Sequence, residues 1–205
     1  MTISMPVEPA ANELLSSDPL ALLIGMLLDQ QVPLERAFSA PYDLYRRLGH
    51  RPTTDELADF DPEALAAVFA ERPALHRYPK SMAARVQALA QLLVASYGGE
   101  AGRVWGDAAD GADLLRRVAG LPGFGAQKAK IFVALLGKRL GVQPAGWREA
   151  AAPFGADGSY LSVADICDEE SLGRVRAYKQ ELKAAAKAQA AATTKPATRA
   201  TTKSR

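Results

Sequence analysis

Apolar residues recur every three to four positions along this chain, in segments bounded by polar residues, prolines or glycines. This spacing is typical of amphipathic α-helices, and the apolar-polar alternation of strands is missing from the sequence. We therefore predict an all-α fold. The predicted helical segments are 17–31, 35–49, 53–60, 61–71, 81–99, 110–120, 126–141, 146–154 and 168–189.

The segment SDPLALLIGMLLDQQ, residues 17–31, is apolar on almost every side. Ser17 or Asp18 can cap its start, and Pro19 suits the first helical position. A helix that is apolar all round is typical of a protein core. We expect this helix to lie at the centre of the fold.

Charge is unevenly distributed along the 205 residues, whose net charge is +2. Residues 183–205 hold six Lys or Arg and no acid, so residues 1–182 carry 19 basic and 23 acidic side chains, a net of −4. We predict an N-terminal extension (1–16), a two-lobed helical domain (17–182) and a basic tail (183–205). The tail ends the last helix and is predicted to be disordered beyond about residue 190. It either adds affinity for phosphate or serves as a solubilising end.

The composition argues against several classes of site. A single cysteine, Cys167, cannot form an internal disulfide, a zinc cluster or a four-cysteine iron–sulfur site, and it is interpreted as a small core residue. The sequence has no apolar stretch of about twenty residues and no secretory signal pattern. We expect a cytoplasmic protein that makes no membrane contact.

The stretch LPGFGAQKAK, residues 121–130, joins two predicted helices. Gly123 and Gly125 allow a positive φ or a close backbone approach, and the next helix begins near Ala126. The unpaired amides at that helix start, together with the helix dipole, form an anion site, and Lys128 and Lys130 add positive charge nearby. The alternative is a plain turn between two helices that needs glycine for its shape.

These residues resemble the helix-hairpin-helix of the HhH-GPD superfamily of base-excision DNA glycosylases. The likeness rests on LPGFG followed by AQKAKIFVALLG, and extends to LLIGMLLDQQVPLERA, residues 22–37. It implies binding of double-stranded DNA that carries a damaged or modified base, with Gln30 or Gln31 entering the stack beside the extruded base. It also implies a monovalent cation, Na⁺ or K⁺, at the carbonyls of Leu121 and Phe124. No other cofactor is expected.

Two catalytic positions of the family differ in this sequence. The place of the Schiff-base lysine is taken by Gln127, and Lys128 stands one position later, about 100° further round the helix. The place of the family aspartate, after the loop of residues 137–151, falls on Ala145, Gly146 and Trp147. The resemblance therefore implies no lyase chemistry, and it leaves the catalytic carboxylate to be found elsewhere.

A carboxylate is needed because breaking an N-glycosidic bond develops positive charge on the sugar. Glu149 is the first candidate and Asp29 the second; each is alternatively an ordinary acid at a helix end. Asp165 is a weaker candidate, since Ser162 and Asp165 also form a capping pattern.

Three further features accompany this site in the sequence. Trp147 either lines a base pocket or anchors the packing, and the neighbouring Arg148 is expected to contact DNA. His76 lies in a basic, aromatic segment, RPALHRYPK, that suits a phosphate backbone or a solvated loop.

We thus expect a monomeric, nucleoid-associated protein that hydrolyses the base–sugar bond of a damaged base without lyase activity. Two alternatives remain open: a catalytically silent protein that binds distorted DNA, and an interaction module whose hairpin meets protein.

Overall fold

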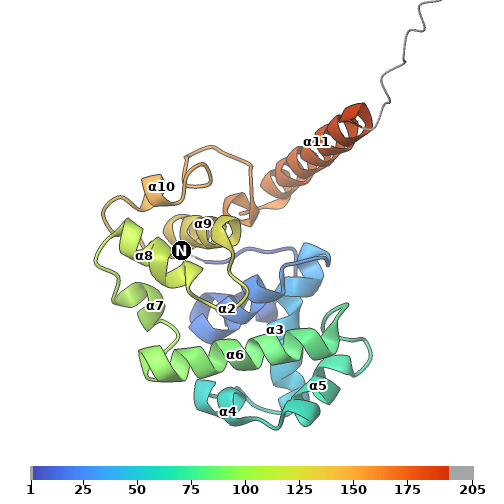
Figure 1. The fold of residues 1–205 in the computed structure, drawn as a ribbon, viewed down its shortest axis with the longest axis vertical. Helices are drawn as coiled ribbons and strands as arrows, with labels where there is room; N and C mark the ends of the chain where they lie inside the picture. The colour runs from blue at the N-terminus through green and yellow to red at the C-terminus, as the bar shows by residue number, and fades with distance from the viewer. Residues whose placement is uncertain (1, 194–205) are drawn as a thin grey trace, which may run out of the picture.

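The computed structural model describes residues 2–193, with the backbone alone described for 188–193. It is built from helices, and these 192 residues contain no strand, so the predicted all-α class is confirmed. Besides eleven α-helices there is one π-helical segment, η1, and one 3-10 turn, η2 (Figure 1). In chain order the elements are α1 (Pro9–Ser17), α2 (Pro19–Leu28), α3 (Leu34–Leu48), α4 (Thr54–Asp59), α5 (Pro62–Ala70), α6 (Pro79–Tyr97), α7 (Arg103–Gly106), α8 (Gly111–Ala119), α9 (Ala126–Leu135), η1 (Leu136–Leu140), α10 (Trp147–Ala150), η2 (Val163–Asp165) and α11 (Glu169–Thr193).

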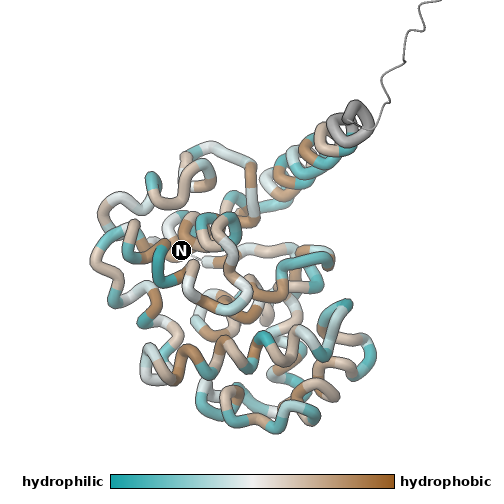
Figure 2. The backbone as a smooth tube through the Cα atoms, viewed as in Figure 1, coloured by the Kyte–Doolittle hydropathy of each residue, from teal (hydrophilic) through white to brown (hydrophobic). Residues whose placement is uncertain are grey.

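Helix α2 lies at the centre of the molecule, as its sequence predicts (Figure 1). The Asp18 carboxylate accepts hydrogen bonds from the amides of Leu20 and Ala21, and Pro19 occupies the first turn. Every residue from Leu20 to Leu28 is buried. In Figure 2 hydrophobic colouring marks parts of this central region and also stretches of the surrounding helices.

The other helices pack around α2 in two groups. Helices α4 and α5 pack on the long helix α6, whereas α8, α9 and α10 pack on one another on the opposite side of α2 (Figure 1). Helices α1 and α3 contact α2 directly. One continuous cluster of buried apolar residues runs through these elements and, at α10, includes Ala151 directly after the helix. The division into two lobes stays a prediction.

Three features of the fold were not predicted. Residues 1–16 contain most of α1, whose Leu15 is buried together with Ile3 and Met5, and the short helix α7 follows α6. The predicted helix 126–141 is α-helical only to Leu135 and widens into η1. The widened turn ends at Gly141, which has φ of 70°.

Helix α11 is the last element that the structure describes, and it extends away from the rest of the molecule (Figure 1). Its end at Thr193 lies a few residues beyond the predicted end, and the predicted disorder of the tail falls mostly on residues 194–205, outside the described range. Within that range, no single helix is long and apolar enough to cross a membrane; α1 and α2 pass such a test only as a pair bent by 114°.

Candidate nucleic-acid interface

The hairpin between α8 and α9 has the conformation that its glycines predict. Gly123 has φ of 83°, and the Phe124 amide donates to the Leu121 carbonyl over 3.1 Å. The Phe124 ring is buried and packs edge-on against Phe132, with centroids 5.6 Å apart. Gly125, with φ of −70°, is the exposed N-cap of α9, and no side chain of the described residues caps this helix. The first amides of α9 are therefore available to an anion.

Lys128 joins this hairpin to the end of α2. Its ammonium donates to the carbonyls of Met26 and Leu27, both over 2.9 Å. A Cβ at Gly123 would lie 3.3 Å from Leu27 Cγ, so the hairpin backbone also rests on α2. Burial lowers the pKa of Lys128, while the charge of Asp29 acts in the opposite direction. The lysine predicted to hold phosphate thus also ties two elements together, and two of its three N–H donors serve that tie.

Asp29 lies at the C-terminal end of α2, beside this contact, and is half-buried. Burial raises the pKa of its carboxyl above the ordinary 3.8, and the positive charges of Lys179 and Lys128 oppose that rise. The charges of two lysines from distant parts of the chain therefore act on one carboxylate. A partly desolvated carboxyl with cationic neighbours is a common feature of catalytic sites.

The structure separates the two candidate glutamines. The side chain of Gln30 is held in place by two hydrogen bonds. Its Nε2 donates to the Leu27 carbonyl over 2.8 Å, and its Oε1 accepts from Arg85 over 3.0 Å. Gln31 is exposed and has φ of 56°, a left-handed conformation that is uncommon outside glycine. Of the two side chains, Gln31 is the one presented to solvent.

His76 is buried, so the interpretation of its segment as a solvated loop or phosphate contact is wrong for this residue. The Tyr78 amide donates to Nδ1 over 3.0 Å, which leaves the proton on Nε2. Nε2 in turn donates to the backbone carbonyl of Gln30 over 2.9 Å. Neither His76 nor Arg85 was predicted to support this turn, because 46 and 55 residues separate them from Gln30 and no local pattern signals the contact.

Trp147 and Glu149, from α10, have different surroundings. Trp147 is 5% exposed, and its ring packs so closely on Gly137 that a Cβ there would lie 2.3 Å from it. The Arg148 guanidinium lies 4.5 Å from the centre of that ring and pairs with Asp157 over 3.1 Å. Glu149 is exposed. The anchoring role proposed for Trp147 as an alternative therefore has direct geometric support.

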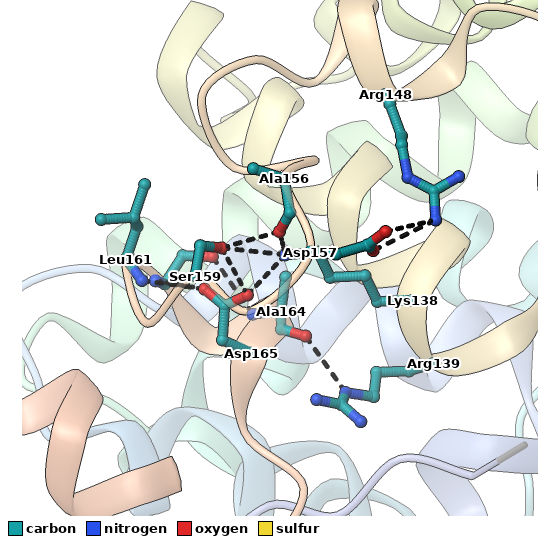
Figure 3. A network of polar contacts seen from close by, with 10 residues as sticks. Lys138, Arg139, Arg148, Ala156, Asp157, Ser159, Leu161, Ala164 and Asp165 are labelled. Carbon is teal, nitrogen blue, oxygen red and sulfur yellow. Dashed lines mark hydrogen bonds and ion pairs between the residues drawn. The ribbon is translucent and has the colours of Figure 1, made fainter.

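Trp147 also lines a polar cavity of about 410 Å³, but Asp29, Gln31 and Glu149 do not. At its base the Asp165 carboxylate accepts from Lys138 over 2.5 Å, from Ser159, and from the amides of Leu161 and Ser162 (Figure 3). The predicted capping pattern of Ser162 and Asp165 is confirmed. With its oxygens so fully used, Asp165 holds the loop before α11 in place.

Metal-binding groups are few in this structure. Residues 2–193 contain no group of three or more His, Cys, Asp or Glu placed to hold a metal ion. Cys167 is exposed, so its interpretation as a core residue is wrong. At the hairpin, the Leu121 carbonyl already accepts one hydrogen bond from Phe124 and keeps its second lone pair. The monovalent cation at this turn stays a prediction, as does the role of the half-buried Lys130.

Comparison of the chain with known protein families finds one match. Residues 24–196 match the family described as HhH-GPD superfamily base excision DNA repair protein. The matched range runs from the middle of α2 through the hairpin and along α11. The chain has no match among curated proteins and none among solved structures. Because the family match covers most of its length, the chain belongs to the HhH-GPD superfamily of base excision DNA repair proteins.

Proposed function

We propose that this protein binds duplex DNA through its hairpin and hydrolyses the N-glycosidic bond of a damaged or modified base. The observation that carries the proposal is the contact of Lys128 with the carbonyls of Met26 and Leu27. Because of this contact, the hairpin lies next to the end of α2, after which Asp29 and Gln31 follow. A phosphate site, a side chain able to enter the stack and a carboxylate therefore share one region.

DNA binding begins at the hairpin in this proposal. The exposed amides at the start of α9 accept a backbone phosphate, and Lys130 with the third N–H of Lys128 adds charge. Exposed Gln31 then fills the gap that the extruded base leaves, since Gln30 is held by Arg85. Arg148 has a smaller part because Asp157 pairs with its charge.

The structure favours Asp29 over Glu149 as the catalytic carboxylate. A carboxylate beside the sugar stabilises the positive charge that develops as the base leaves, or activates the attacking water. Asp29 is half-buried beside the hairpin contact, where such an interaction is weakly screened, whereas Glu149 is exposed. Lyase chemistry is not part of the proposal, because Gln127 stands in the lysine position and the Lys128 ammonium is engaged by two carbonyls.

The first test is a glycosylase screen. Purified protein is incubated with duplexes that carry deaminated, oxidised or alkylated bases, and strand breaks are measured with and without hot alkali. Breaks that need alkali are the expected result. Breaks without alkali would reveal a lyase lysine, and intact strands throughout would contradict the proposed hydrolysis.

Two matched substitutions then identify the carboxylate. With the substrate that the screen finds, D29N is expected to lower the single-turnover rate by about 100-fold or more while duplex binding is retained, since a positioned acid–base group contributes about 10²–10⁴-fold. E149Q removes a carboxylate of α10 in the same way and is expected to keep the rate. The opposite ranking would assign the role to Glu149.

A specific observation supports a second candidate, a silent protein that recognises distorted DNA. The sequence positions where the family aspartate is expected hold Ala145 and Gly146, neither of which has a carboxylate. The adjoining Trp147 is buried against Gly137. Tight binding to a damaged duplex without release of any base would favour this candidate.

A further inference from the structure

Helix α11 carries its positive charges on one face. Arg176, Lys179, Lys183 and Lys187 follow one another at steps of three, four and four residues. With 3.6 residues per turn, a step of four advances about 6 Å and rotates by only about 40°, so these side chains form one stripe. Glu181 and the Arg174–Glu170 ion pair lie on the opposite side of the helix. The three lysines of this series are called the lysine stripe below.

The stripe begins against the body of the protein. Leu172 and Val175, which lie on the same side of α11 as the stripe, are buried, and Arg176 pairs with Glu35 at the start of α3. Lys179 is close enough to Asp29 for its charge to act on that carboxyl. The stripe therefore starts where α11 is attached to the body of the protein, next to the start of α3.

Beyond this point the helix leaves the body (Figure 1). Lys183 and Lys187 are exposed, and neither forms an ion pair within the described part of the chain. Lys187 lies about 12 Å further along the helix axis than Lys179. Unpaired ammonium groups thus continue outward from the place where α11 leaves the body.

The positive charge of the stripe contrasts with the net charge of the chain up to residue 182, which includes Lys179. Residues 1–182 have a net charge of −4, which repels a polyanion. Duplex DNA carries one negative charge per about 1.7 Å of axis, so the region beyond the hairpin needs local positive charge to lie near the body. We propose that Lys179, Lys183 and Lys187 hold the phosphate backbone of duplex DNA that flanks the hairpin contact. This inference rests on the proposed DNA binding and extends it along α11.

The test compares substitutions on the two faces of α11 in the full-length chain. K183Q removes one charge from the stripe, and R174Q removes one charge from the opposite face. K183Q/K187Q removes two charges and leaves Lys179, beside Asp29, unchanged. Affinity for a fluorescent duplex that carries an abasic site is measured by anisotropy at several salt concentrations, and circular dichroism checks that each variant is folded.

The salt dependence distinguishes the outcomes. Each lost phosphate contact lowers the slope of log affinity against log salt by about 0.9, so the double variant loses about 1.8. Between about 50 and 200 mM salt, its affinity should then fall about tenfold less than that of the wild type. R174Q is expected to keep the wild-type slope.

Three results would count against these ideas, each in its own way. A double variant with the wild-type slope, in a protein that does bind DNA, would overturn the inference and leave the exposed face to a protein partner. Equal losses for K183Q and R174Q would also overturn it, since they would mean a general effect of charge. Failure of the wild type to bind any duplex would overturn the proposed function itself.

Discussion

Asp29 carries a carboxylate at the end of a helix whose residues from Leu20 onward are all buried. Burial raises the pKa of this group, which means that the folded protein favours the neutral acid more than the unfolded chain does. Ionised Asp29 is therefore a cost to folding at neutral pH, which Lys179 and Lys128 only partly offset. Such a cost is retained in proteins where function requires the charge.

This cost predicts the effect of D29N on stability. From the ordinary pKa of 3.8 up to the raised value, the folded state binds more protons than the unfolded state, so the free energy of unfolding falls as pH rises. Near pH 7 the Asn variant should thus melt at a higher temperature than the wild type, by about 2–4 °C for each kcal/mol recovered. Below pH 3.8 the two should converge. Thermal melts across this pH range measure the difference, and a variant less stable than the wild type at pH 7 would contradict it.

Besides the buried side chains of the hairpin, such as Leu121 and Phe124, the Lys128 tie attaches the helix-hairpin-helix to α2. Two charge-assisted hydrogen bonds join residues 102 and 101 positions apart. Their loss removes the Lys128 donor from the Met26 carbonyl and leaves the Leu27 carbonyl with the Gln30 side chain alone. Since these carbonyls lie only two to five positions before Asp29 and Gln31, the tie positions the turn as well as the hairpin.

K128M tests this tie. Removing one partner of a partly buried hydrogen bond costs about 1–3 kcal/mol, so urea denaturation should show a loss of about that size in the free energy of unfolding. K130M, on the same helix, removes a lysine for which the structure shows no such bond, and its effect is expected to stay within about 0.5 kcal/mol. Equal losses for the two variants would mean that Lys128 is not the tie.

The hydrophobic cluster that runs from α1 to α11 makes the whole molecule depend on α2. Leu23 is fully buried in that helix and belongs to the apolar cluster, which continues both into α4, α5 and α6 and into the helices of the hairpin. Loss of its side chain therefore weakens both groups together.

L23A is expected to destabilise the protein by about 2–5 kcal/mol, because it creates a cavity in the core. For a chain of this length the melting temperature should fall by about 4–20 °C, still in one cooperative transition. Calorimetry measures both quantities. Two resolved transitions, with only one shifted, would show that the two groups of helices unfold independently.

The elements of this fold follow from residues that are close together in sequence. Asp18 and Pro19 start α2, Thr53 and Asp61 cap α4 and α5, and Gly49 and Gly98 end α3 and α6 in the left-handed conformation. The hairpin is local in the same sense, because Gly123 and the start of α9 define it. Caps and turns depend on hydrogen bonds across two to four residues, so the sequence alone was enough to predict them.

The roles of the site residues depend instead on contacts between distant parts of the chain. Gln30 and Gln31 are adjacent and identical in type, yet Arg85 holds one while the other is exposed. Asp29 lies at the end of α2 and Glu149 in the first turn of α10. The two carboxyls differ in burial, since Asp29 is half-buried and Glu149 is exposed. The sequence by itself determined most of the helices, though not α1, α7 or η1, and it determined the hairpin and the family resemblance. Burial and the distances between charges arise only when the helices pack, so the tertiary structure decided which residues form the site.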